Sequence, residues 1–190
     1  MKKILILIAL VLPMLSMAQN DVAVVPELHG VLIFTDNTPL ADYDIVGEIT
    51  YQQDSPDPYV ANPAQYDKIR RGLVINAILA NRQVEGIITD IHDNGTGSAK
   101  MIIFRPEAKD RNLARVHEYK GVLYFYDCEP KNAYTSVKKY GAPSSFRYSV
   151  VRKGVIKKAA KKKMRKQGVN AVVVTYRTTM RDKVNAIRFE

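Results

Sequence analysis

The chain has 190 residues, of which 46% are hydrophobic and 25% charged, a balance typical of a globular protein. Its formal net charge of +10 is unevenly distributed, because residues 19–105 carry 6 basic and 12 acidic side chains and residues 106–190 carry 21 basic and 7 acidic ones. Cys128 is the single cysteine, which excludes an internal disulfide and leaves an intermolecular bridge or a small core residue as its role.

The first eighteen residues have the pattern of a secretory signal peptide. A basic start precedes the apolar run Ile4–Leu12, and Ser16 and Ala18 are small residues at the −3 and −1 positions of a cleavage site. The apolar run is shorter than the about 20 residues that a spanning helix needs. We therefore expect residues 1–18 to be removed and the mature chain to be periplasmic or secreted. No cysteine follows the signal, so we do not expect a lipoprotein.

The rest of the chain contains one unit twice. Residues 27–39 align without gaps to residues 118–130, and nine of the 23 positions in 27–49 are identical to their counterparts. The alignment resumes at Arg71-Gly72, which matches Lys153-Gly154, and later pairs 84–104 with 169–189. We expect three segments after the signal peptide: an acidic first repeat over 19–105, a linker over 106–116 and a basic second repeat over 117–190.

Hydrophobic patterning predicts the same elements in each repeat. Runs of Val, Leu, Ile, Phe and Tyr indicate strands, apolar residues at helical spacing indicate a helix, and Asn94-Gly95 indicates a hairpin turn. In the first repeat we expect strands over 30–35 and 43–51, a helix over 67–82 and a hairpin over 84–104. In the second we expect strands over 121–126 and 134–140, a helix over 149–167, and strands over 169–176 and 184–189.

These elements predict an α+β fold made of two tandem ββαββ repeats. Each antiparallel sheet would be covered by one helix, and the two repeats would be related by a pseudo-twofold axis. One repeat of about 75 residues would bury little core by itself, so we expect each repeat to complete the hydrophobic interior of the other.

A local resemblance supports this fold class. The segment Gln167-Gly-Val-Asn-Ala-Val-Val-Val174, in which a helix runs into a β-branched strand, resembles the helix–strand junction of the YbjQ-type and RcsF-like families of small envelope proteins. The resemblance covers about 20 residues per repeat. It implies a shared packing unit and carries over no ligand or catalytic residue.

The sequence contains no motif that indicates catalysis or a cofactor. His29, His92 and His117 do not have the spacing of metal ligands. The oxygen-rich segment 90–97 departs from the calcium loop of an EF-hand, and its Asn-Gly pair favours a hairpin instead. Neither a nucleophile elbow nor a glycine-rich phosphate loop is present. We predict a non-enzymatic protein without metal or cofactor, and keep a small hydrolase or metal-dependent enzyme as an alternative.

The predicted functional surface is a basic helix in the second repeat. Nine of the 15 residues in 152–166 are Lys or Arg. A helical wheel places five of them on one face, away from Val155 and Ala159, and these five are Lys157, Lys158, Lys161, Lys162 and Arg165. Alternation along the strand predicts that Lys120, Tyr124 and Tyr126 share a sheet face, which we expect to contribute to the same surface.

Several partners fit this surface. Cations on one helix face repel one another unless an anion lies opposite, so we expect an acidic protein surface, an anionic glycan or a lipid headgroup. Export makes nucleic acid a poor candidate. Two alternatives stay open: a basic face that serves solubility alone, and self-association in which the acidic repeat of one molecule meets the basic repeat of another.

Overall fold

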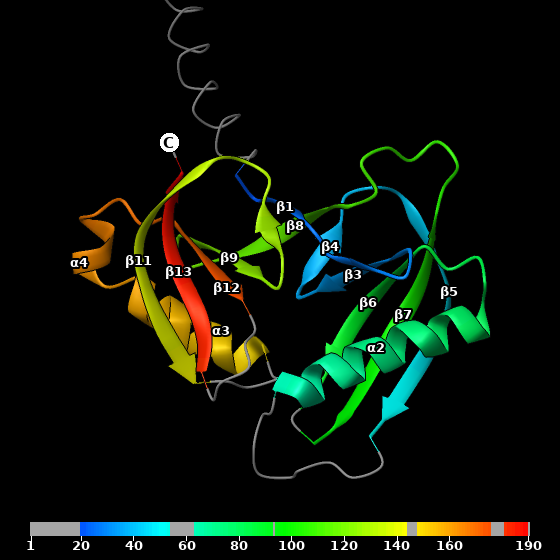
Figure 1. Ribbon diagram of the computed structural model, residues 1–190. Coiled ribbons are helices and arrows are strands. Elements are labelled where there is room, and N and C mark those ends of the chain that lie inside the picture. Colours follow the sequence, from blue (N-terminus) through cyan, green and yellow to red (C-terminus); the bar gives the residue numbers. More distant parts are fainter. Residues whose placement is uncertain (1–19, 54–62, 93, 144–147, 176–180, 190) are drawn as a thin grey trace, which may run out of the picture.

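The computed structural model describes residues 20–53, 63–92, 94–143, 148–175 and 181–189 (Figure 1). The predicted signal peptide lies outside these residues. Within the described ranges, thirteen strands form two sheets, and three helices accompany them. None of the helices in these ranges has both the length and the apolar character that a membrane crossing requires.

The five-stranded sheet comes from the first half of the chain. Its order is β2 (Glu27–Leu28), β3 (Val31–Thr35), β6 (Gly86–Ile91), β7 (Thr96–Phe104) and β5 (Tyr43–Gln52). β3 and β6 are parallel, and the other neighbours are antiparallel. Helix α2 (Pro63–Ala80) covers one face, because Ile69, Leu73 and Ala77 recur at helical spacing and are fully buried against the sheet.

The eight-stranded sheet contains the second half of the chain and two strands of the first half. Its path is β10 (Glu129–Pro130), β1 (Val22–Val24), β8 (Leu113–Tyr119), β9 (Val122–Tyr126), β12 (Ala171–Thr175), β13 (Arg181–Phe189) and β11 (Tyr134–Pro143), and β4 (Asn37–Pro39) pairs with β8 off this path. Helices α3 (Tyr148–Ala159) and α4 (Lys162–Arg165) cover one face. β9 and β12 are parallel, as β3 and β6 are in the other sheet.

The two halves exchange strands with each other. β10 of the second half pairs with β1, where Ala23 faces Pro130, and β4 of the first half pairs with β8, where Thr38 faces Arg115. β1 and β8 also pair directly. Strands from both halves therefore alternate in the middle of the molecule, and backbone hydrogen bonds hold the halves together.

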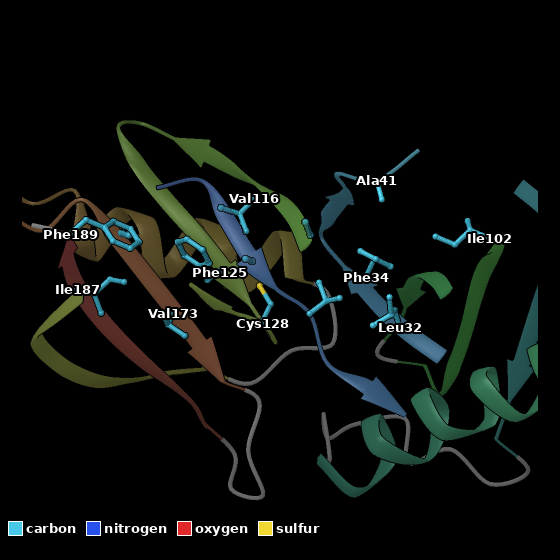
Figure 2. Close-up of a cluster of buried hydrophobic side chains, with 14 of the residues drawn as sticks. Leu32, Phe34, Ala41, Ile102, Val116, Phe125, Cys128, Val173, Ile187 and Phe189 are labelled. Atoms are coloured by element: carbon cyan, nitrogen blue, oxygen red, sulfur yellow. The ribbon is translucent and has the colours of Figure 1, made fainter. Parts of the chain in front are cut away.

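A shared hydrophobic cluster lies between the two sheets, and Figure 2 shows its side chains. Phe34 and Phe104 of the first half pack edge to face at 6.3 Å between ring centroids, and Phe125 and Phe189 of the second half pack at 6.0 Å. All four rings are at most 6% exposed. Because one cluster contains both pairs, separating the halves would expose a face of each sheet to water.

The predicted fold of two antiparallel ββαββ repeats, each covered by one helix and related by a pseudo-twofold axis, is wrong. The sheets are mixed rather than antiparallel, and one of them holds eight strands that include pieces of both halves. The helix in each half is a crossover connection, which lets the next strand run in the same direction as the earlier one. As a result β6 is parallel to β3 in the first half, and β12 is parallel to β9 in the second. Short strands from both halves then add to the central sheet.

The second predicted helix also differs from the structure. A single helix was expected over 149–167, but α3 ends at Ala159 and α4 begins at Lys162, because Lys161 has an extended backbone with φ −61° and ψ 143°. The break redirects the chain, and Met164 turns inward and is buried. His29 lies in the β2–β3 turn with φ 53°, just before the strand predicted over 30–35.

Candidate functional site

The predicted basic surface consists of six cations. All six are exposed, and they come from α3, from α4 with the residue before it, and from the β8–β9 turn. They are Lys157, Lys158, Lys161, Lys162, Arg165 and Lys120. Lys153, Lys163 and Lys166 are exposed beside them. The cations are therefore presented to solvent by two helices and a turn.

Packing of the apolar residues decides which way the lysines face. Val151, Val155 and Ala159 lie on one side of α3 and are buried against the sheet, with exposed fractions of 3%, 1% and 0%. A helix that buries this stripe must turn the intervening residues outward, and Lys157 and Lys158 are exposed as a result.

A hydrogen bond joins two separate parts of the basic surface. Arg165 donates from Nη2 to the backbone carbonyl oxygen of Lys120 at 2.7 Å. Lys120 and Gly121 form the β8–β9 turn with φ values of 56° and 73°, a conformation that leaves the carbonyl accessible to the guanidinium. The structure thus brings together Lys120 and α4, which are 45 residues apart in the chain.

Two of the predicted site residues do not belong to the surface. Tyr124 and Tyr126 are 0% and 1% exposed, and their rings stack at 6.0 Å between centroids. They do share one face of β9, as alternation predicted, but α3 covers that face. The periodicity of a strand shows which residues lie together and does not show which face a helix covers. These tyrosines therefore contribute to the core beneath the basic surface.

The structure adds Tyr140, which the sequence analysis did not assign to the site. Lys158 Nζ lies 4.0 Å from the centroid of the Tyr140 ring, and the Tyr140 hydroxyl donates to the carbonyl oxygen of Val155 at 3.3 Å. Burial raises the pKa of Tyr140 to about 12, so the phenol stays neutral and its ring face remains available to the ammonium. In the sequence, the only signal for this contact is an aromatic residue at the end of the strand predicted over 134–140.

The basic surface has no acidic counterpart within the part of the chain that the structure describes. Among these residues, the ion pairs of α3 and α4 involve only Arg152, which reaches Asp36 at 3.2 Å and is not part of the surface. The six cations of the surface make no ion pair with any described carboxylate. Their mutual repulsion is therefore uncompensated, which favours an anion from outside the chain.

The oxygen-rich segment 90–97 forms the β6–β7 hairpin. Asn94 Oδ1 accepts a hydrogen bond from the Thr96 hydroxyl at 2.7 Å, and Gly95 has φ 80°. His92 Nε2 lies 3.7 Å from Asp90, and both side chains are about half exposed. Asp93 is outside the described residues. In the described part of the chain, no three His, Cys, Asp or Glu side chains lie close enough together to hold a metal ion.

A solvent-open hollow of about 860 Å³ lies beside β4 and β8. Its polar lining includes Asp21, Arg115 and His117, and Asp21 pairs with Arg115 at 3.2 Å. The remaining lining includes Leu123 and Phe189 from the shared cluster. Arg115 and Asp21 neutralise each other, and Thr38 and Glu118 join His117 in the lining.

No protein-family model, curated protein or solved structure matches this chain. The resemblance to YbjQ-type and RcsF-like proteins therefore stays a prediction.

Proposed function

We propose that this chain is an exported, non-enzymatic binding protein that attaches through its basic surface to the anionic headgroups of a membrane. The observation that carries this proposal is the gathering of six exposed cations on α3, α4 with the residue before it, and the β8–β9 turn, none of which makes an ion pair with a described carboxylate. Packing and the Arg165–Lys120 hydrogen bond hold these elements, so their backbone needs little further ordering when the cations bind.

The chemistry of the surface favours attachment by charge rather than by insertion. The exposed large hydrophobic residues of the described ranges lie elsewhere, and Val151, Val155, Ile156 and Met164 of α3 and α4 are buried in the core. A lysine or arginine near an anionic membrane contributes about 1 kcal/mol, so six of them support binding of moderate strength that salt weakens. The same membrane would repel the acidic first half. The molecule would therefore be oriented with its second half toward the membrane surface.

The test measures binding of the chain from Gln19 onward to vesicles of phosphatidylglycerol and phosphatidylcholine, compared with phosphatidylcholine alone. We expect cosedimentation with the anionic vesicles only, and a steep decrease as salt is added. The triple variant Lys157→Glu/Lys161→Glu/Lys162→Glu should abolish binding to the anionic vesicles. Arg165 is left unchanged because it donates a hydrogen bond to the carbonyl oxygen of Lys120.

The matched control is Lys68→Glu/Arg71→Glu/Arg82→Glu. It reverses three exposed cations of the first half and changes the net charge by the same amount, so it should still bind. Equal binding by both triple variants would show that the basic surface is not the site of membrane binding. Binding to a sulfated glycan, with none to anionic vesicles, would contradict the assignment to lipid.

A further inference from the structure

We propose that copies of this chain associate head to tail, with the edge strand β5 of one copy pairing with the edge strand β11 of the next. The inference is independent of membrane attachment. It starts from one end of each sheet, where the edge strands are β5 and β11, each ten residues long; the strands at the other ends, β2 and β10, have two residues each. Each has a single strand neighbour, β7 for β5 and β13 for β11.

The two edge strands lie on opposite sides of the molecule, with β11 on the left and β5 on the right in Figure 1. Helix α2 partly covers the end of β5, because Asn76 donates to the carbonyl oxygen of Thr50 at 2.9 Å. Among the described strands, residues 43–49 of β5 pair only with β7, so their other backbone edge is a template for another strand. One copy therefore presents two edges that cannot reach each other.

The edges have matching shapes. Each strand has an irregularity after its third residue, where the register shifts between Ile45 and Gly47 in β5 and between Ser136 and Lys138 in β11. Both strands also begin with an aromatic residue, Tyr43 or Tyr134, that packs against the shared cluster. The two edges thus have the same length and the same place for the bulge.

Their charges are opposite. β5 contains Asp44 and Glu48 and no basic residue, whereas β11 contains Lys138 and Lys139 and no acidic residue. All four side chains are exposed. Asp44 has a long contact of 3.6 Å with Arg105, but Glu48, Lys138 and Lys139 have no ion pair among the described residues.

This charge pattern selects the pairing. Two β5 edges would bring carboxylates together, and two β11 edges would bring ammonium groups together, so both symmetric pairings are disfavoured. Pairing β5 with β11 brings opposite charges together, and it also covers Ile45, which is 53% exposed on β5. Lysines and bulges protect edge strands from indiscriminate pairing. On β11 the lysines disfavour a basic or neutral partner strand, so the acidic edge of β5 is the favoured partner. Such a heterologous contact repeats from copy to copy.

Sedimentation velocity of the chain from Gln19 onward tests the proposal. We expect a sedimentation coefficient that rises with protein concentration at low salt and falls when salt is added. Glu48→Lys, and separately Lys138→Glu/Lys139→Glu, should each weaken association by roughly tenfold. Lys68→Glu/Arg71→Glu is the matched control for the lysine variant, because both residues are exposed and neither belongs to β5 or β11, and it should associate as the unaltered chain does.

Mixing gives the decisive result. A chain with Asp44→Lys/Glu48→Lys has two basic edges and the Lys138→Glu/Lys139→Glu chain has two acidic ones, so each should associate more weakly alone than the unaltered chain does, and the mixture should assemble. Ile45→Lys offers an independent block of the β5 edge if a charge variant unfolds. A monomeric unaltered chain at low salt and high concentration overturns the proposal, as does a mixture that does not assemble although both variants are folded.

Discussion

Arg70 of helix α2 donates from Nη1 to Oδ2 of Asp127 at 2.9 Å and so connects the first half of the chain to the end of β9 in the second. The reciprocal contact is also present, because Arg152 of α3 donates to Asp36 at the end of β3 at 3.2 Å. In each case a helix of one half holds the strand end of the other. Asp36 and Asp127 both have φ 51°, so the two turns share one backbone conformation.

Removing one partner of this contact should destabilise the fold strongly. Arg70→Met keeps the apolar stem but leaves the Asp127 carboxylate, which is 15% exposed, without its cation. Breaking a buried ion pair in this way costs about 3–5 kcal/mol. Urea unfolding measures the loss, and Arg71→Met, at an exposed neighbouring position, should change stability by less than about 0.5 kcal/mol. Equal effects of the two changes would show that the contact contributes little.

The same carboxyls should make stability depend on pH. Burial raises the pKa of Asp36 and of Asp127 above the ordinary value of 3.8, although Arg152 and Arg70 oppose the increase. A raised carboxyl pKa means that the folded state holds its proton more tightly, so this contribution is present below pH 3.8 and is lost as pH rises through the folded-state values.

Asp36→Asn/Asp127→Asn should flatten that part of the stability curve. Asn tolerates the positive φ of both positions, so the turns should keep their conformation. Unfolding free energies measured by urea at a series of acidic pH values provide the comparison. Parallel curves for the unaltered and doubly substituted chains would contradict the assignment of the pH dependence to these two groups.

Two corresponding glycines should respond in opposite directions to alanine. A Cβ at Gly72 would lie 2.2 Å from Cε2 of Tyr51, whereas a Cβ at Gly154 would have no neighbour within 4 Å. Gly72→Ala should cost about 1–3 kcal/mol by overpacking, and Gly154→Ala should stabilise α3 by about 0.5–1 kcal/mol. Thermal unfolding of the two variants gives the sign of each effect. A destabilising Gly154→Ala would be inconsistent with this packing.

Cys128 should be unreactive in the folded protein. It is 6% exposed within the shared cluster, and burial raises the pKa of its thiol to about 12. The thiolate that alkylating reagents attack is therefore scarce and covered at neutral pH. We expect no labelling by iodoacetamide until the chain is unfolded, with Ser136→Cys, on the exposed part of β11, as a rapidly labelled control. Rapid labelling of native Cys128, or a disulfide-linked dimer, would contradict the burial of this side chain.

Local elements were largely predictable from the sequence because their signals are contained in short segments. The apolar spacing of Ile69, Leu73 and Ala77 predicted helix α2, and Asn94-Gly95 predicted the hairpin between β6 and β7. The exposure of Lys157 followed from the buried stripe on α3. In each case residues close together in the chain determine the outcome, so a single sequence suffices.

The tertiary structure alone decided how these elements combine. β10 and β4 are two and three residues long, so they have no periodicity of their own and exist as strands through the partners that they pair with. The side of β9 that buries Tyr124 depends on where α3 packs, and the partner of Arg70 lies 57 residues away. Hydrophobic patterning by itself determined which residues avoid water. The strand directions, the exchanged strands and the reciprocal ion pairs depended on contacts between distant segments. Periodicity could not predict them, because it shows that a residue is buried and not which surface covers it.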